Sequence, residues 1–336
     1  MSPIDALRWL TAVQSQDYTG AKWGLAQRSR RATSAELDQL FDDGIILRTH
    51  VLRPTWHFVL PDDVRWLLDL TGPKIRRGLA ARYRELELDD KTFERAHKAF
   101  IVALAGGRHL TRAELGEALR KARISTEGQR LPHLLMHAEL DGLIVSGPRR
   151  GKLFTYALLE ERAPKSRAVE RSEAIVELSA RYFQSHGPAQ LQDFAWWSGL
   201  TMADARAGAR LAGAALGHET IEGKEYWFDA KAGRVPDAAG VAHLLPNFDE
   251  YTVAYRDRAE MVHADDALAG ILSNVVTIGG KVRGMWRRTP AGSGVRLEVR
   301  AMDQYTPAER ASVEDAARRF GRFLERPTEV TWPSFV

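Results

Sequence analysis

One arrangement, a short helix followed by a second helix and a β-hairpin, recurs along this chain of 336 residues. It is clearest in residues 108–157. Thr111 and Glu114 have the spacing of a capping box at the start of the first helix. A second helix is predicted over residues 130–141 and ends at Gly142, and two strands then flank a turn rich in glycine and arginine. This order is typical of a winged-helix unit, with the second helix in the recognition position.

Two other stretches follow the same plan less regularly. Residues 189–199 and 201–215 predict two helices, and residues 218–228 predict a hairpin. Residues 34–42 predict a capped helix, followed by strands within residues 45–60. A single winged helix would serve a protein contact as readily as a nucleic-acid contact. Three tandem units favour an extended track along a nucleic-acid duplex.

The pattern changes in the C-terminal part of the chain. Strands are predicted at residues 241–245, 251–255, 274–286, 295–299 and 329–332, and one helix at residues 307–324 with Thr306 as its cap. Short strands with one helix indicate a small β-barrel or a curled sheet. We therefore expect an α+β chain, mainly helical, with three tandem winged-helix units and a C-terminal small β-barrel.

Two breaks in the pattern set the expected domain limits. Residues 160–167 form a charged linker that contains a proline, and residues 230–240 contain two glycines and a proline. The predicted domains are an N-terminal helix with the first winged-helix unit, the second unit, the third unit and the barrel-like domain, at residues 1–100, 101–162, 163–235 and 236–336.

Composition restricts the class of protein. With 44% hydrophobic residues and nine tryptophans the chain can bury a sizeable core. Residues 1–160 carry 25 Lys and Arg against 20 Asp and Glu, and the remainder carries 23 against 24, so the basic excess is N-terminal. The absence of cysteine excludes disulfides and iron–sulfur clusters. No apolar run approaches the roughly 20 residues of a membrane span, so we expect a cytoplasmic protein without a membrane partner.

Common catalytic signatures are missing from the sequence. The phosphate-binding loop and the dinucleotide motif are absent, and no serine or cysteine triad is indicated. His133 and His137 share one helix face, but Leu134 stands where a zinc protease has glutamate. We therefore predict no metal site and no cofactor.

Gln14 and Gln16 stand at the end of an otherwise apolar predicted N-terminal helix and are candidate functional residues. Residues two apart on a regular helix point away from each other, so both amides reach one site only where the helix ends, as Gly20 suggests. The alternative is that these glutamines are solvated or cap neighbouring carbonyl groups.

Four segments together resemble the winged-helix DNA glycosylases of the AlkZ type, the family that unhooks interstrand crosslinks. They are the Gln14-Ser15-Gln16 motif and residues 53–57, 245–251 and 280–286. The resemblance implies that Gln14 and Gln16 are catalytic, and that three winged helices and a β-barrel form a C-shaped arrangement. Ser15 departs from the aliphatic residue usual in the family, which bears on substrate range more than on fold.

A glutamine side chain is suited to catalysis when the leaving base already carries a positive charge. An N7-alkylated guanine is already cationic, so its glycosidic bond breaks through an oxocarbenium-like state without a strong acid. An amide oxygen orients water but does not take a full proton. We therefore expect a metal-independent monofunctional DNA glycosylase acting on bulky or crosslinking N-alkylpurines in double-stranded DNA. We expect it to be a monomer, associated with the nucleoid when bound.

Further residues are expected to support the site or bind DNA. Arg53, Thr55 and His57 alternate along a strand and share one side, and Asp249 could assist electrostatically or act as a base. The simpler alternatives are a core histidine and a turn-capping aspartate. The candidate DNA-binding residues are Arg149, Arg150, Lys152, Lys281, Arg283, Trp286, Arg287 and Arg288.

Two other functions fit the same pattern. The protein could be a non-catalytic DNA-binding module, such as a transcription regulator or a lesion shield, whose glutamines only satisfy backbone groups. Sequence-specific regulators usually dimerise to match paired half-sites, so a monomer without base preference would favour the enzyme. A third possibility is a barrel that binds a small ligand to control DNA binding.

Overall fold

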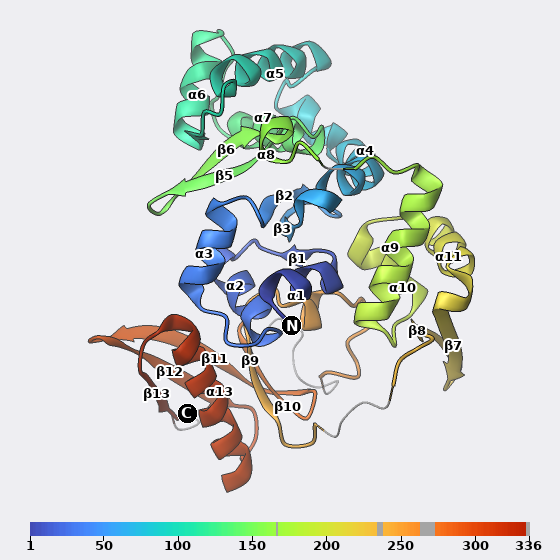
Figure 1. Cartoon of the computed structure of the whole chain (residues 1–336), viewed down its shortest axis with the longest axis vertical. Coiled ribbons are helices and arrows are strands. Elements are labelled where there is room, and N and C mark those ends of the chain that lie inside the picture. Colours follow the sequence, from blue (N-terminus) through green and yellow to red (C-terminus); the bar gives the residue numbers. More distant parts are fainter. Residues whose placement is uncertain (166, 234–237, 263–272, 334–336) are drawn as a thin grey trace. The chain divides into compact units, whose positions relative to one another are not determined.

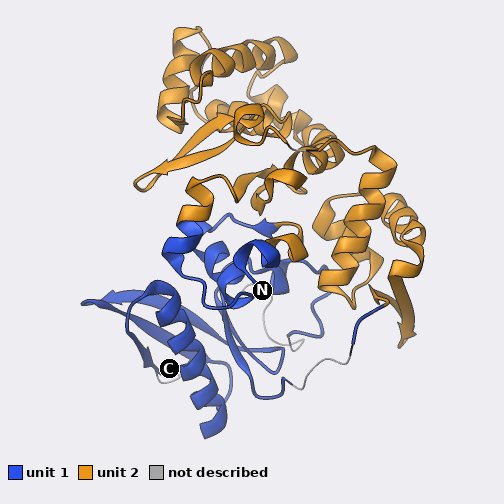
Figure 2. Ribbon diagram, in the orientation of Figure 1, with its two compact units in different colours: residues 1–6, 13–38, 231–336 blue, residues 7–12, 39–230 orange. Residues whose placement is uncertain are grey.

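The chain divides into two compact units, shown in Figure 2. Unit 1 comprises residues 1–6, 13–38 and 231–336, and unit 2 comprises residues 7–12 and 39–230. The computed structural model describes residues 1–165, 167–233, 238–262 and 273–333. Part of the predicted boundary at residues 230–240 therefore lies outside the described residues.

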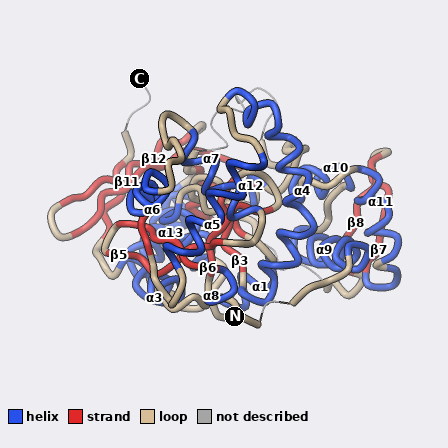
Figure 3. Tube along the Cα trace, turned by 90° about the horizontal axis from the view of Figure 1, so that it is seen from above, coloured by secondary structure: helices blue, strands red, loops and turns tan. Residues whose placement is uncertain are grey.

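The fold is α+β, as predicted, with most of the helices in unit 2 and the largest sheet in unit 1 (Figures 1 and 3). Two helices contribute residues to both units: α1 (Pro3–Leu10) and α3 (Ser34–Asp42). The other elements of unit 2 are β2 (Leu47–Val51), β3 (Thr55–Val59), α4 (Pro61–Glu85), α5 (Asp90–Leu104), β4 (Leu110–Thr111), α6 (Arg112–Lys121), α7 (Arg130–Leu140), β5 (Ile144–Arg150), β6 (Leu153–Leu158), α8 (Leu159–Arg162), α9 (Arg171–His186), α10 (Leu191–Ser198), α11 (Met202–Leu211), η1 (Gly213–Ala215), β7 (Leu216–Ile221) and β8 (Lys224–Asp229).

The predicted helix–helix–hairpin segment of residues 108–157 is confirmed as α6, α7 and the β5–β6 hairpin. Thr111 and Glu114 form the predicted capping box, with the Thr111 N–H donating to Glu114 Oε2 at 2.7 Å. Gly142 follows α7 with a φ of 65°, a conformation that favours glycine. Apolar side chains of α5, α6 and α7, among them Phe100 and Leu119, bury this segment against α4.

The segment of residues 189–228 also follows its prediction, as α10, α11 and the β7–β8 hairpin. Thr201 caps α11 through a second capping box, with Asp204. α11 packs closely on α9 at Gly208, where an added Cβ atom would lie 2.0 Å from Ser179 Oγ. The absence of a side chain at position 208 therefore sets how closely the two helices approach.

Unit 1 contains the main sheet. Its elements are β1 (Val13–Gln14), α2 (Tyr18–Gln27), β9 (Ala242–Leu245), α12 (Glu250–Val253), β10 (Val275–Ile278), β11 (Lys281–Ala291), β12 (Gly294–Ala301), α13 (Pro307–Leu324) and β13 (Thr328–Thr331). Five strands form one sheet in the order β13-β12-β11-β10-β9, antiparallel except for the β12–β13 pair. α13 begins at the predicted cap Thr306.

The predicted closed β-barrel is wrong for the part of the chain that the structure describes. The five strands form an open sheet with β9 and β13 at its edges. α13 supplies the cover that barrel closure would otherwise provide, because its buried side chains include Val313, Phe320 and Phe323. The ring of Phe320 lies 5.3 Å from that of Trp286 on β11, edge-on.

Two other strand predictions in this unit are wrong. Residues 251–255 form the end of α12 and a turn, because Asp249 accepts a hydrogen bond of 2.9 Å from the Tyr251 N–H and so caps a helix. Residues 274–286 form two strands instead of one, because Gly279 and Gly280 take positive φ values and reverse the chain between β10 and β11. Among the described residues, no helix is long and apolar enough to cross a membrane.

Candidate active site

The predicted catalytic glutamines lie in an extended segment between α1 and α2. α1 ends before the motif, where Thr11 has a φ of 71° that breaks the helix. Gln14 is the last residue of β1, and Gln16 lies in the bend that leads to α2. The carboxylate of Asp17 caps α2 by accepting a bond of 3.0 Å from the Gly20 N–H. The expectation that the motif ends a helix near Gly20 is therefore wrong.

The glutamine motif is anchored by the segment that contains α12. The Gln14 backbone N–H donates to Glu250 Oε1 at 2.7 Å, and Glu250 is buried. Gln14 is 7% exposed, whereas Gln16 is exposed. Ser15 is fully buried, so the residue that departs from the family pattern occupies a core position between the two amides. Two of the segments that carry the family resemblance thus meet within unit 1.

Asp249 is held by a guanidinium group. Arg28 Nη1 and Nη2 donate to the two Asp249 carboxylate oxygens at 3.0 and 2.7 Å, while one of these oxygens also caps α12. The Asp249 side chain is 1% exposed and that of Arg28 is 28% exposed. Burial lowers the pKa of Arg28, but the charge and hydrogen bonds of Asp249, together with the charges of Glu250 and Tyr255, outweigh this effect and the net change in pKa is upward. The arrangement fixes the direction of the carboxylate.

Two glycines of α2 allow the segment that contains Pro246 and Asp249 to approach this helix closely. A Cβ atom at Gly20 would lie 3.1 Å from Pro246 Cβ, and one at Gly24 would lie 3.1 Å from Asp249 Oδ2. On the same helix, the Trp23 indole N–H donates to the Leu244 carbonyl at 2.6 Å. α2 therefore joins the glutamine motif to the segment before α12.

Arg53, Thr55 and His57 belong to unit 2, in and beside the β2–β3 hairpin. His57 is fully buried, and its Nδ1 lies 2.9 Å from the Thr55 carbonyl. A carbonyl only accepts, so Nδ1 carries the proton in this arrangement and Nε2 is the acceptor nitrogen. The Arg53 guanidinium lies 5.6 Å from the ring of Trp196 on α10.

The cations of the β5–β6 hairpin have different surroundings. Arg149 donates to both carboxylate oxygens of Asp42, the shorter bond being 2.8 Å. Arg150 donates to Glu114 at 2.8 Å, and this bond, with those from Thr111, holds the pKa of Glu114 at about 2. Lys152 is exposed beside Gly151 at the tip. Two of the three predicted phosphate contacts are therefore already paired with carboxylates.

The predicted basic strip of β11 is paired in a similar way. Arg283 bonds Asp303 and Glu309 at 2.8 and 3.0 Å, Arg287 bonds Glu298 at 2.7 Å, and Lys281 lies 3.6 Å from Glu260. Trp286 is 6% exposed and its indole N–H donates to the Leu245 carbonyl at 2.8 Å, so it is a core residue. Arg288 is exposed, and its guanidinium lies 5.9 Å from the Phe320 ring.

A family model for DNA glycosylases described as AlkZ-like matches residues 7–323, nearly the whole chain. The chain belongs to the AlkZ-like DNA glycosylase family. Membership makes it an enzyme of the DNA glycosylase class.

Two comparisons with Streptomyces sahachiroi agree with this assignment. The curated "Interstrand DNA cross-link repair glycosylase" is 25% identical over 337 residues, covering 90% of this chain and 88% of its own length. The solved structure of the DNA glycosylase AlkZ has a TM-score of 0.79 and 21% identity, and the match covers 98% of this chain and 94% of the other. The structural match shows that this member of the AlkZ-like family has the AlkZ fold.

Sequence reasoning missed two residues at the site of this AlkZ-like chain, Arg28 and Glu250. Glu250 directly follows Asp249 in a segment that carries the resemblance, and Arg28 opens a basic run that ends at Arg31. Neither sequence feature identifies the residue that it contacts, because Arg28 and Asp249 are 221 positions apart, and Gln14 and Glu250 are 236 positions apart. Local patterns do not encode such pairs.

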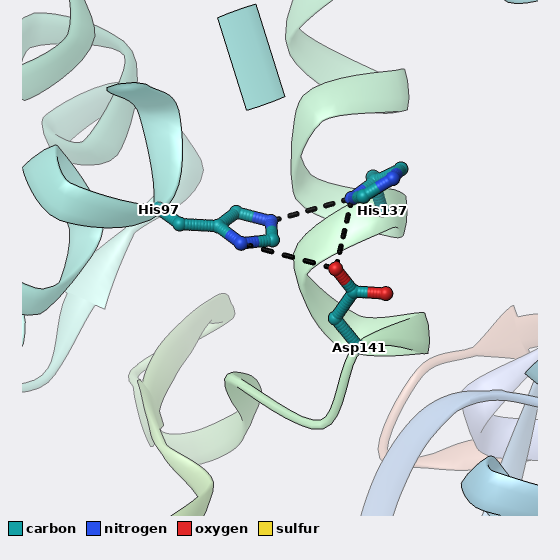
Figure 4. A group of neighbouring side chains, drawn as sticks. All are labelled: His97, His137 and Asp141. Atoms are coloured by element: carbon teal, nitrogen blue, oxygen red, sulfur yellow. Dashed lines mark hydrogen bonds and ion pairs between the residues drawn. The ribbon is translucent and has the colours of Figure 1, made fainter. Parts of the chain in front are cut away.

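One group of side chains could hold a metal ion. His97 on α5, His137 on α7 and Asp141 after α7 point toward one another (Figure 4). His137 Nδ1 lies 3.3 Å from His97 Nε2 and 3.4 Å from Asp141 Oδ2. Arg76 also contacts Asp141, and its positive charge would compete with a metal ion for this carboxylate. Burial, followed by the charges of His97 and Arg76, lowers the pKa of His137 to about 3.

The predicted pair of histidines on α7 does not form this group. His133 lies edge-on to Tyr83, with ring centroids 5.8 Å apart, whereas His137 stacks on Phe93 at 3.7 Å. The group belongs to unit 2 and Gln14 belongs to unit 1. The prediction of metal-independent chemistry at the glutamines therefore stays a prediction, separate from this group.

Proposed function

We propose that this chain is a monofunctional DNA glycosylase that hydrolyses the N-glycosidic bond of cationic N-alkylpurines, of the N7-alkylguanine type, in duplex DNA. Membership of the AlkZ-like family supports the enzyme class. The name of the Streptomyces relative, a cross-link repair glycosylase, supports bulky or crosslinking adducts as substrates. The observation that carries the proposal is the extended Gln14-Ser15-Gln16 segment, whose backbone is fixed by buried Glu250.

The chemistry requires placement more than proton transfer. Water adds to C1′ of the damaged nucleotide, and the base leaves with the electrons of the glycosidic bond, which neutralise its positive charge. An amide oxygen of Gln14 or Gln16 accepts a hydrogen bond from the water or faces the developing sugar cation. The proton of the water passes to solvent. A fixed backbone at Gln14 lowers the entropy cost of placing that amide.

Asp249 acts as a support in this mechanism. Both of its carboxylate oxygens are engaged by Arg28, and one also caps α12. Both oxygens are thus engaged in bonds that hold the local structure, which favours a supporting role over proton transfer. Normal bases leave as anions unless an acid protonates them, and the amides of Gln14 and Gln16 do not supply that proton, so normal bases are not substrates. Arg53, Thr55 and His57 are proposed to support the reaction from unit 2.

The helix–helix–hairpin segments are proposed to be winged-helix units that follow the duplex. α6 and α7 with the β5–β6 hairpin form the most regular unit, α10 and α11 with β7–β8 form another, and α3 with β2–β3 forms a third. The phosphate contacts proposed for the enzyme, acting as a monomer, include Lys152, at the exposed tip of the β5–β6 hairpin.

A single-turnover assay on a duplex with one N7-alkylguanine tests the proposal. We expect the wild type to release the base equally well with EDTA, and Gln14→Ala or Gln16→Ala to slow release by about 100-fold or more, as for loss of one transition-state contact. Gln184→Ala, on α9, is the matched control and should keep the wild-type rate. Equal duplex binding by all variants without any release would leave a DNA-binding module instead.

A further inference from the structure

A basic cavity in unit 1 has no place in the mechanism above. It has a volume of about 610 Å³. Its walls come from the C-terminal half of α2, the loop that follows α2, strand β9 and the end of α13. Its polar lining includes Arg31, Arg319, Arg322, His243 and Gln27, and none of the described residues that line it carries a carboxylate. We name it the α2–α13 pocket.

The arginines of the α2–α13 pocket differ from the paired ones of β11. Arg319 is held in place, because it contacts Asp315 and donates to the Ala242 carbonyl at 2.7 Å. The exposed side chains of Arg31 and Arg322 make no ion pair or hydrogen bond with any residue that the structure describes. Two guanidinium groups without a carboxylate partner among the described residues thus line a cavity that also contains Arg319, which is paired with Asp315.

The uncharged side chain of Gln27 gives a second indication that the pocket binds a ligand. Its side-chain nitrogen is buried and has no acceptor among the described residues. A buried donor without a partner is unfavourable, so native structures usually supply an acceptor. Gln27 also lines a smaller cavity of about 250 Å³ beside Arg28 and Tyr251. An anionic oxygen at the junction of the two cavities would satisfy this amide.

The walls of the pocket are rigid. Trp23 and Phe323 line its base with ring centroids 5.2 Å apart, and the Trp23 indole N–H is fixed on Leu244. Arg31 has a φ of 56°, and the neighbouring Ser29 hydroxyl donates to the Leu25 carbonyl at 2.7 Å, which fixes the start of the loop. Arg319, held on the Ala242 carbonyl, is a donor placed in advance, and such a donor binds an anion with a small ordering cost.

We propose that the α2–α13 pocket binds a backbone phosphate of the DNA substrate. The inference rests on the proposed function, since that function supplies the polyanion. α2 carries Gln27 at its end and Arg28 next to it, and it follows directly on the glutamine motif. A phosphate held here fixes one strand of the DNA relative to Gln14 within the same unit. The pocket is thus a positioning site and not a catalytic one.

Matched double variants test the pocket. Arg31→Ala/Arg322→Ala removes its two unpaired arginines, and Arg30→Ala/Arg326→Ala removes two exposed arginines from the same loop and the end of α13, neither of which lines the pocket. Affinity for an undamaged duplex is measured over a range of salt concentrations. We expect the pocket pair to weaken binding about tenfold and to reduce the salt slope by about one to two, and the control pair to change binding less than about threefold.

Gln27→Leu separates a specific site from general attraction, because it changes no charge. We expect it to weaken duplex binding about tenfold or more, the cost of one hydrogen bond to a charged group, with the melting temperature retained. Equal losses in the two double variants, together with wild-type binding by Gln27→Leu, would overturn the proposal. A mononucleotide 5′-phosphate that binds the wild type more tightly than the duplex, and is lost in the pocket pair, would overturn it too by assigning a small-molecule site.

The failure of this inference is distinct from failure of the proposed function. If the wild type releases N7-alkylguanine but both double variants bind DNA equally, the pocket is wrong and the glycosylase proposal stands. If the pocket pair loses duplex binding selectively but the wild type releases no base, the phosphate site stands and the substrate proposal fails.

Discussion

At the scale of single residues, the site depends on Asp249, whose buried carboxylate serves both Arg28 and the start of α12. Removing its charge leaves Arg28 without a counter-ion in a largely buried position. We expect Asp249→Asn to lower the free energy of unfolding by about 2–4 kcal/mol, less than for a fully buried pair because Arg28 is partly exposed. Urea denaturation measures this, and Arg28→Met closes a double-mutant cycle.

The same variant tests the catalytic role of Asp249. In the folded fraction of Asp249→Asn we expect base release to fall less than about tenfold, because a positioning group contributes less than a proton acceptor. A loss as large as that of Gln14→Ala, with stability restored in the double variant but activity not, would make Asp249 a general base.

Tyr83 on α4 carries a buried hydroxyl without a partner among the described residues. Burial raises its pKa from 10.0 to about 12, although the charge of Arg76 opposes this. The folded state therefore favours the neutral phenol. This contribution to stability is complete below pH 10 and is lost as the pH rises from 10 to 12.

Tyr83→Phe removes both the hydroxyl and its titration. We expect the variant to be as stable as the wild type, or up to about 1 kcal/mol more stable, at neutral pH, since a buried unpaired group is removed. Between pH 10 and 12 the wild type should lose about 2–3 kcal/mol relative to the variant. A constant difference in the free energy of unfolding between the two proteins over the whole pH range would show that the hydroxyl finds a hydrogen-bond partner.

At the scale of elements, glycine positions determine how closely helices approach. A Cβ atom at Gly208 on α11 would lie 2.0 Å from Ser179 Oγ and 2.9 Å from the Ile175 carbonyl on α9. Gly78 on α4 has no atom within 4 Å of such a Cβ. We expect Gly208→Ala to destabilise the protein by about 1–3 kcal/mol through overpacking, and Gly78→Ala to stabilise it by up to about 1 kcal/mol through helix propensity.

Thermal unfolding of the two variants beside the wild type checks this contrast. Both changes add one methyl group to a helix, so helix propensity alone would move both melting temperatures upward. A rise in the melting temperatures of both variants would mean that α9 and α11 move apart at little cost in stability.

Elements with local signals were predictable and those with distant partners were not. The capping boxes at Thr111 and Thr306 gave the starts of α6 and α13, because the residues that satisfy the first turn are three positions apart. The strand predicted at residues 251–255 is a helix because Asp249 caps it, and an aspartate in a turn has the same local pattern. The glutamines were predicted as residues of interest, but their extended backbone depends on Glu250, 236 positions away.

At the scale of the whole molecule, most of the predicted DNA-binding cations are already paired. The chain has 48 Lys and Arg against 44 Asp and Glu, and a count of cations alone would predict a strong dependence of binding on salt. Arg149, Arg150, Arg283 and Arg287 each have a carboxylate partner. A paired arginine gives up one contact for each phosphate contact that it gains.

We therefore expect a shallow salt dependence for the wild type. If Lys152, Arg288 and the two unpaired arginines of the α2–α13 pocket make the phosphate contacts, the slope of log K against log salt is about −3 to −4, whereas contacts from the paired cations as well would give about −7 or steeper. Glu298 holds both Arg287 and Arg300, at 2.7 and 2.9 Å. Glu298→Gln weakens the hold on both, and we expect it to make the slope steeper by about one to two if β11 and β12 face the duplex. A wild-type slope near −3 to −4 that Glu298→Gln leaves unchanged would mean that Arg287 and Arg300 make no phosphate contact and that unit 1 binds DNA through Arg288 and the pocket.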